Sequence, residues 1–171
     1  MAAHRSGAHG PAGETGMLVT MAPLEHDDVV TFVAQHPHAA MVTLRPDGTP
    51  HMARVELGVV DGRIRAASAP GLVRTQNLRR DRRCSLFVFG EHPVWVGLET
   101  DADVVEGEKG PEALVALLRQ RHRDTPDGQV MVHDDAIGGD RLYAVEEFLS
   151  HAAEQGLGVF DFTIRRAYGN P

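Results

Sequence analysis

Apolar residues recur at helical spacing in four segments of the chain, and turn residues separate these segments from their neighbours. The predicted helices span about residues 25–35, 72–81, 111–122 and 140–153. Pro37 ends the first of them, since the residue before a proline disfavours helical backbone. Gly71 breaks the chain before the second, and Pro111 suits the first turn of the third.

Between these helices, alternating or continuous apolar runs predict strands. They lie at about residues 39–44, 50–60, 63–68, 84–89, 94–107 and 157–169. Arg45-Pro46-Asp47-Gly48 and Asp61-Gly62 have the composition of tight turns, and Asp-Gly is a strong hairpin signal. Six strands in short hairpin units predict a mainly β fold, a six-stranded antiparallel barrel with added helices.

Composition agrees with a globular protein of this size. The 171 residues are 42% hydrophobic, which is enough for one core, and we expect a single domain at 17–171. Residues 1–16, rich in Gly, Ala and His, are expected to be a disordered tail. No apolar run approaches the ~20 residues that cross a bilayer, and the N-terminus lacks a signal-peptide core. We expect a cytoplasmic protein with no membrane partner.

Charge is unevenly distributed. The formal net charge is −7, which argues against a nucleic-acid partner. Five arginines nevertheless fall within ten positions: Arg74, Arg79, Arg80, Arg82 and Arg83. A helix start that follows a glycine break and carries arginine can bind a phosphate. An arginine-rich, solvated surface helix explains the same composition, so both interpretations stay open.

Other chemistry-bearing residues give weaker signals. The ten histidines show no trusted metal-ligand spacing, and no metal site is expected. Cys84 begins an apolar strand, which favours a buried, inert thiol. His51 lies on the predicted strand at 50–60. No catalytic residue is assigned.

The run VDGRIRAASAPGLVRTQNLRRDRRCSLFVF (60–89) bears on the choice between these two interpretations of the arginine segment. It resembles the split β-barrel flavin and deazaflavin oxidoreductases, the superfamily of pyridoxamine 5'-phosphate oxidase. The resemblance is closest to the actinobacterial branch that uses coenzyme F-420. It covers residues 24–125 and 157–169 and rests on Ser68, a short break, Arg74 and NLRRDRR before an apolar strand. Residues 126–156 are longer than this pattern requires, and we expect a helical insertion there.

The resemblance implies a set of cofactor-binding residues. Arg74 matches the phosphate-binding cation, with Thr75 beside it and Asn77 supporting the loop. Ala67 and Ser68 match the strand end that faces the cofactor. Arg54 and Val55 match the strand that lies along the cofactor ring, and His51 on the same strand is a candidate contact to substrate or cofactor. Trp95 matches a position near the ring that the partner subunit often supplies.

The implied function is an oxidoreductase that transfers hydride from reduced F-420 to a conjugated acceptor, such as an enone, a quinone or a tetrapyrrole like biliverdin. The resemblance also implies a homodimer with the cofactor groove at its interface. An FMN-dependent oxidoreductase of the same fold is the alternative, and extra arginines near the groove favour F-420 because its tail is long and anionic. A non-catalytic cofactor or haem carrier, and an interaction module with a decayed site, also remain open.

Overall fold

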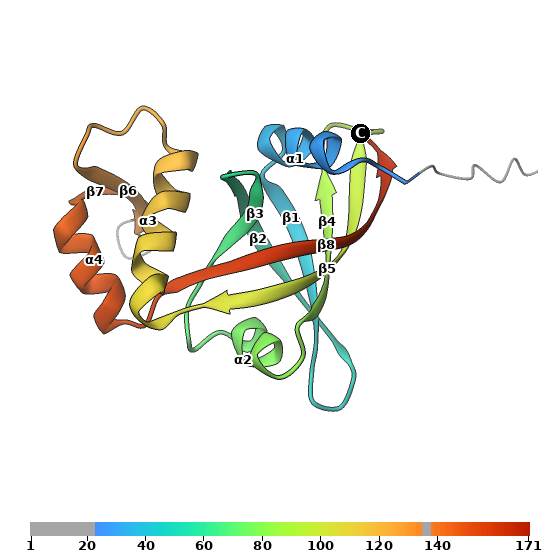
Figure 1. Cartoon of the computed structure of the whole chain (residues 1–171), viewed down its shortest axis with the longest axis horizontal. Coiled ribbons are helices and arrows are strands. Elements are labelled where there is room, and N and C mark those ends of the chain that lie inside the picture. The colour runs from blue at the N-terminus through green and yellow to red at the C-terminus, as the bar shows by residue number, and fades with distance from the viewer. Residues whose placement is uncertain (1–22, 135–137) are drawn as a thin grey trace, which may run out of the picture.

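Six strands close into an antiparallel barrel in the computed structural model, which describes residues 23–134 and 138–171 (Figure 1). The six-stranded barrel predicted from the sequence is therefore confirmed, whereas the predicted tail lies outside the described residues. The barrel strands are β1 (His38–Leu44), β2 (Pro50–Val60), β3 (Arg63–Ser68), β4 (Arg83–Phe89), β5 (Trp95–Val105) and β8 (Gly158–Asn170). The helices are α1 (His26–Gln35), α2 (Val73–Arg80), α3 (Gly110–Arg121) and α4 (Val145–Glu154), with a short 3-10 turn at Gly107–Lys109.

The strands follow the order β1-β2-β3-β8-β5-β4, and β4 pairs with β1 to close the barrel. Alternate residues of each strand point inward, as strand geometry requires. The interior side chains are fully or nearly fully buried, and the largest are Phe160, Met41, Leu57, Ile64, Leu86 and Leu98. This core holds the strands in a fixed register, so positions on the outer face are also fixed.

Two helices cover opposite ends of the barrel (Figure 1). Helix α1 buries Val29, Phe32 and Val33 in the barrel core, which is the apolar stripe seen in the sequence. Helix α2 contributes Leu78 to the same core. The buried side-chain amide of Asn77 donates a hydrogen bond to the Thr43 hydroxyl at 3.0 Å, which ties α2 to β1.

Helices α3 and α4 form a second layer beside the barrel together with a hairpin of two strands, β6 (Gln129–Asp134) and β7 (Gly139–Ala144) (Figure 1). Leu117, Val130 and Phe148 form its core, which reaches the barrel through Val159.

Among the described residues, no helix is long and apolar enough to span a membrane.

The helix predicted at 140–153 is wrong in its first part. Residues 139–144 are strand β7, and the helix begins only at Val145. The pattern placed Leu142 on the buried side of a helix, but on β7 this side chain is exposed. Its partner across the hairpin is Met131, a pairing that local helical spacing cannot indicate. Residues 126–156, expected to be a helical insertion, thus form part hairpin and part helix.

Candidate functional site

The barrel wall opens between β2 and β3. The ladder joining these two strands runs from Val60 opposite Arg63 to Leu57 opposite Ala66, and ends there. Before Leu57, β2 pairs with β1, while β3 continues its pairing with β8. The two strands therefore diverge, and a cavity lies at the point of divergence.

This cavity has a volume of about 170 Å3 and is rich in arginine. We call it the arginine cavity, and its lining residues are Arg54, Val55, Glu56, Ala66, Ala67, Arg74 and Arg121. Three guanidiniums and a single carboxylate thus meet around a space that is large enough for a phosphate group. Strands β2 and β3 supply its walls, and α2 and α3 each supply one arginine.

Two of these guanidiniums have unused donors. The Nε atoms of Arg74 and Arg121 are buried and have no hydrogen-bond partner among the described residues. Burial lowers the pKa of both side chains from the ordinary arginine value, and for Arg121 the nearby Glu56 partly opposes this shift. A buried donor without a partner lowers the stability of the folded protein, so a hydrogen-bond acceptor next to these Nε atoms would be stabilising. An anion in the cavity would provide one.

The other arginines of the cluster are engaged elsewhere. Arg79 pairs with Glu106, Arg82 with Asp103 at 2.7 Å and Arg83 with Asp81 at 2.7 Å. Arg80 donates to the backbone carbonyl of Leu44. Of the five clustered arginines, Arg74 alone lines the arginine cavity. The surface-helix interpretation therefore holds for these four arginines, and phosphate binding stays a prediction for Arg74.

Two further predicted residues, Thr75 and Asn77, hold α2 in place, and a third, Ser68, lies nearby in the sequence at the end of β3. The Thr75 hydroxyl donates to the carbonyl of Ala69 at 2.7 Å, which holds the first turn of α2 against the end of β3. Asn77 binds Thr43, as described above. Ser68 is buried at the end of β3, opposite Gly158 of β8. Thr75 and Asn77 thus position α2, and none of the three residues lines the cavity.

An apolar hollow of about 400 Å3 adjoins the arginine cavity on the outer face of the barrel. It is lined by Ala39, Ala40, Met52, Ala53, Arg54 and Phe89. Arg54 lines both spaces, so they are neighbours. One site thus offers positive charge on one side of Arg54 and an apolar surface on the other.

The hollow belongs to a larger apolar face, which we define as Met52, Phe87, Phe89 and Trp95. Met52 is 70% exposed, and the two phenylalanines are 45% and 46% exposed. Trp95 stacks on Phe87 with ring centroids 5.3 Å apart, so it lies on this face and does not line the arginine cavity. Exposed apolar clusters of this kind mark interaction surfaces.

His51 and Cys84 lie outside both spaces. His51 is half-buried opposite Thr43, and its Nδ1 atom is buried without a described partner. Burial raises the pKa of the Cys84 thiol to about 11, which keeps it protonated and inert near neutral pH. Within the described residues, no group of His, Cys, Asp and Glu is arranged to hold a metal ion.

A comparison with known protein families identifies the family to which this fold belongs. The profile of the family described as Pyridoxamine 5'-phosphate oxidase matches residues 26–141, which include β1 to β5, α2 and α3. The chain belongs to the pyridoxamine 5'-phosphate oxidase family. The resemblance to this superfamily is thereby confirmed. No curated protein sequence matches the chain significantly.

Solved structures share the fold of this family member at low sequence identity. A conserved hypothetical protein from Mycobacterium tuberculosis is 20% identical with a TM-score of 0.64, covering 91% of this chain and 89% of that one. An F-420 reductase is 13% identical with a TM-score of 0.53, covering 79% and 92%. The haem storage protein of Vibrio cholerae is 10% identical with a TM-score of 0.56, covering 84% and 92%. These likenesses concern the fold.

In this member of the family, the structure places two further residues at the site that the sequence did not indicate. Arg121 ends α3 and looks in the sequence like an ordinary cation at a helix C-terminus. Glu56 looks like an outward-facing residue of a strand. Only the packing of α3 against β2 brings them together at the cavity. Their proximity has no signature in the local sequence.

Proposed function

We propose that the protein binds coenzyme F-420 and transfers hydride from its reduced form to a conjugated small-molecule acceptor, such as an enone, a quinone or a tetrapyrrole. The observation that carries this proposal is the arginine cavity beside an apolar hollow, with Arg54 shared by both. A phosphorylated flavin-type cofactor has the same two parts, an anion and a flat ring. Family membership supports this choice of cofactor class.

The chain's own residues would bind and orient the cofactor. Arg74 offers a planar, bidentate donor to the phosphate, and its free Nε atom is part of that donor edge. Arg54 and Val55 would lie along the ring, and Met52 and Phe89 would shield it from water. When bound, the cofactor itself supplies the hydride chemistry. Glu56 is the one acidic residue among the described lining groups, which fits a site whose work is positioning.

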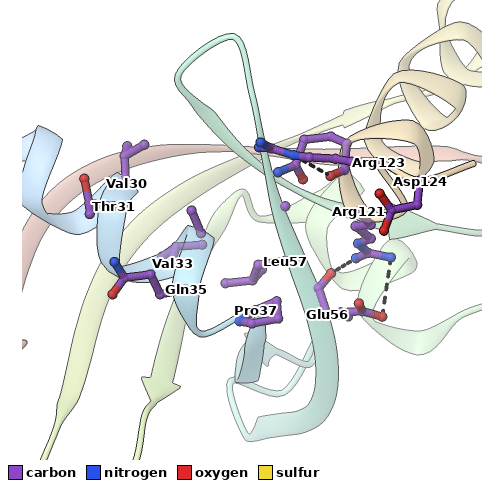
Figure 2. Close-up of a pocket in the computed structure, with 13 residues that line it drawn as sticks. Val30, Thr31, Val33, Gln35, Pro37, Glu56, Leu57, Arg121, Arg123 and Asp124 are labelled. Carbon is purple, nitrogen blue, oxygen red and sulfur yellow. Dashed lines mark hydrogen bonds and ion pairs between the residues drawn. The ribbon is translucent and has the colours of Figure 1, made fainter.

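The choice of F-420 over FMN rests on room for a long anionic tail. A groove of about 630 Å3 lies between the ends of α1 and α3 and shares Arg121 and Glu56 with the arginine cavity (Figure 2). Arg123 also lines this groove, next to Asp124. The clustered arginines from 79 to 83 are paired with other groups, so Arg123 is the cation of this groove that we assign to the tail.

Titration of the apo protein with F-420 and with FMN, followed by cofactor fluorescence, tests the proposal. We expect binding of F-420 at least tenfold tighter than that of FMN, because only F-420 has a tail that reaches the groove. Tighter FMN binding would assign the protein to the flavin-dependent alternative. Binding of neither cofactor would refute a cofactor site. Reduced F-420 is then mixed with enone, quinone and tetrapyrrole acceptors, and tight binding without turnover would favour a carrier.

We also propose that a second copy of the chain covers the apolar face and completes the cofactor groove. Replacing Phe89 by aspartate should convert a homodimer into a monomer, because the new charge would be desolvated in the interface. Sedimentation velocity measures the change. Ser150→Asp on α4 is the control, since Ser150 is exposed on a helix that takes no part in the apolar face. A dimer that survives Phe89→Asp would place the interface elsewhere.

A further inference from the structure

Arg121 is held at the arginine cavity by the packing of α3. The Leu117 side chain is fully buried between α3 and the barrel. A Cβ atom on Gly58 of β2 would lie 2.5 Å from Leu117 and 2.7 Å from Gln120, so glycine allows the last turn of α3 to lie close against β2. The Arg121 side chain is consequently only 11% exposed. Its position depends on the fold and is unlike that of a free surface arginine.

The hydrogen bonding of Arg121 is incomplete. A guanidinium has five N–H donors. In Arg121, Nη2 donates to the backbone carbonyl of Glu56, Nη1 lies 3.7 Å from the Glu56 carboxylate, and Nε has no partner among the described residues. A separation of 3.7 Å is an ion pair but is too long for a hydrogen bond. Figure 2 shows Arg121 turned toward Glu56, with both contacts made to this one residue.

The charges around the cavity also favour an anion. Arg54, Arg74 and Arg121 carry three positive charges and Glu56 carries one negative charge, which leaves two positive charges. The phosphate of F-420 is a diester with one negative charge, and the phosphomonoester of FMN carries about −1.5 to −2 charges at pH 7, so either anion would reduce the excess of positive charge. Glu56 is about half exposed, so its carboxylate can turn to solvent when a stronger acceptor arrives.

We propose that Arg121 is a second anion-binding guanidinium of the arginine cavity, and that the Glu56 carboxylate competes with the incoming phosphate for it. This inference rests on the proposed function, because the anion it assigns is the cofactor phosphate. Arg121 then determines affinity and specificity for phosphorylated ligands. Because the incoming phosphate has to displace the Glu56 carboxylate from Arg121, Glu56 lowers the affinity of the site for the anion.

The test compares ligands with and without the phosphate in the full-length protein. F-420 is paired with the deazariboflavin that lacks its phosphate and tail, and FMN is paired with riboflavin. Arg121→Ala should weaken binding of the phosphorylated member of the preferred pair at least tenfold and leave its phosphate-free partner within twofold. Arg121→Lys should recover part of the loss, because it restores charge without the planar fork. Glu56→Gln should strengthen binding of the phosphorylated member severalfold.

Controls separate this inference from the proposed function. Arg119→Ala is the matched control, since Arg119 lies on the same turn of α3 and pairs with Asp127 at the surface. Thermal melting of each variant reports whether α3 stays docked. If Arg74→Ala weakens cofactor binding but a folded Arg121→Ala does not, the inference fails and the proposed function stands. If the wild-type protein binds neither phosphorylated cofactor, both fail.

Discussion

Replacing Arg74 by alanine is expected to weaken F-420 binding by about 1.5–3 kcal/mol, the range for a hydrogen bond to a charged group. This corresponds to a rise of roughly 10- to 150-fold in the dissociation constant. Arg74 is the one member of the arginine cluster that lines the arginine cavity, and its buried Nε atom lacks a described partner. Fluorescence titration measures the change.

Arg79→Ala is the matched control for this measurement. Arg79 lies one and a half turns further along α2 and pairs with Glu106 at the surface. Exposed ion pairs contribute about 0–1 kcal/mol to stability, and this one is remote from the cavity lining, so affinity should stay within twofold. A folded Arg74→Ala protein with unchanged affinity would remove the arginine cavity as the phosphate site. Equal losses in both variants would indicate a diffuse effect of charge.

Truncation of Phe160 to alanine is expected to lower the free energy of unfolding by about 3–5 kcal/mol, because the barrel cannot fill the space that the ring leaves. Phe160 is fully buried and is the largest such side chain in the described core. It lies on β8 between Ala66 of β3 and Val104 of β5, so it supports the strand that carries the cavity wall. Urea denaturation followed by far-UV circular dichroism measures the loss.

Thr163→Ala on the same strand provides the comparison. Thr163 is exposed, and surface substitutions of this kind change stability by no more than about 0.5 kcal/mol. A loss below 1 kcal/mol for Phe160→Ala would mean that the barrel core is less tightly packed than its burial indicates. The fraction of Phe160→Ala protein that stays folded should still bind cofactor, since the Phe160 side chain lines neither the arginine cavity nor the apolar hollow.

Most of the barrel could be predicted from the sequence because its strands are bounded by strong turn signals. The predicted strands at 50–60 and 63–68 agree with β2 and β3 at both ends. Asp61 and Gly62 between them both adopt positive φ, which suits an Asp-Gly turn. The hairpin β6–β7 was missed because apolar residues of β7 and α4 happen to continue one another at helical spacing.

The candidate site could be predicted only in part. The resemblance named Arg54, Val55, Ala67 and Arg74, and the structure brings these four together in one cavity. Trp95 lies on the apolar face, where its predicted place near the cofactor ring stays a prediction, and His51 lines neither space. Arg121 enters the site through the contact of α3 with Gly58, which is more than 60 positions away in sequence. Such long-range packing leaves no periodicity to detect.

The position of β8 in the barrel has a consequence for how the protein is made. It is the last barrel strand in chain order, yet it lies between β3 and β5 and pairs with both. Until its residues have left the ribosome, β3 and β5 present open edges that can pair with other chains. The nascent protein therefore exposes both edges from the completion of β5 until β8 follows. Residues 158–170 close both edges, and only then does β3, which carries Ala66 and Ala67 of the arginine cavity, gain its second partner strand.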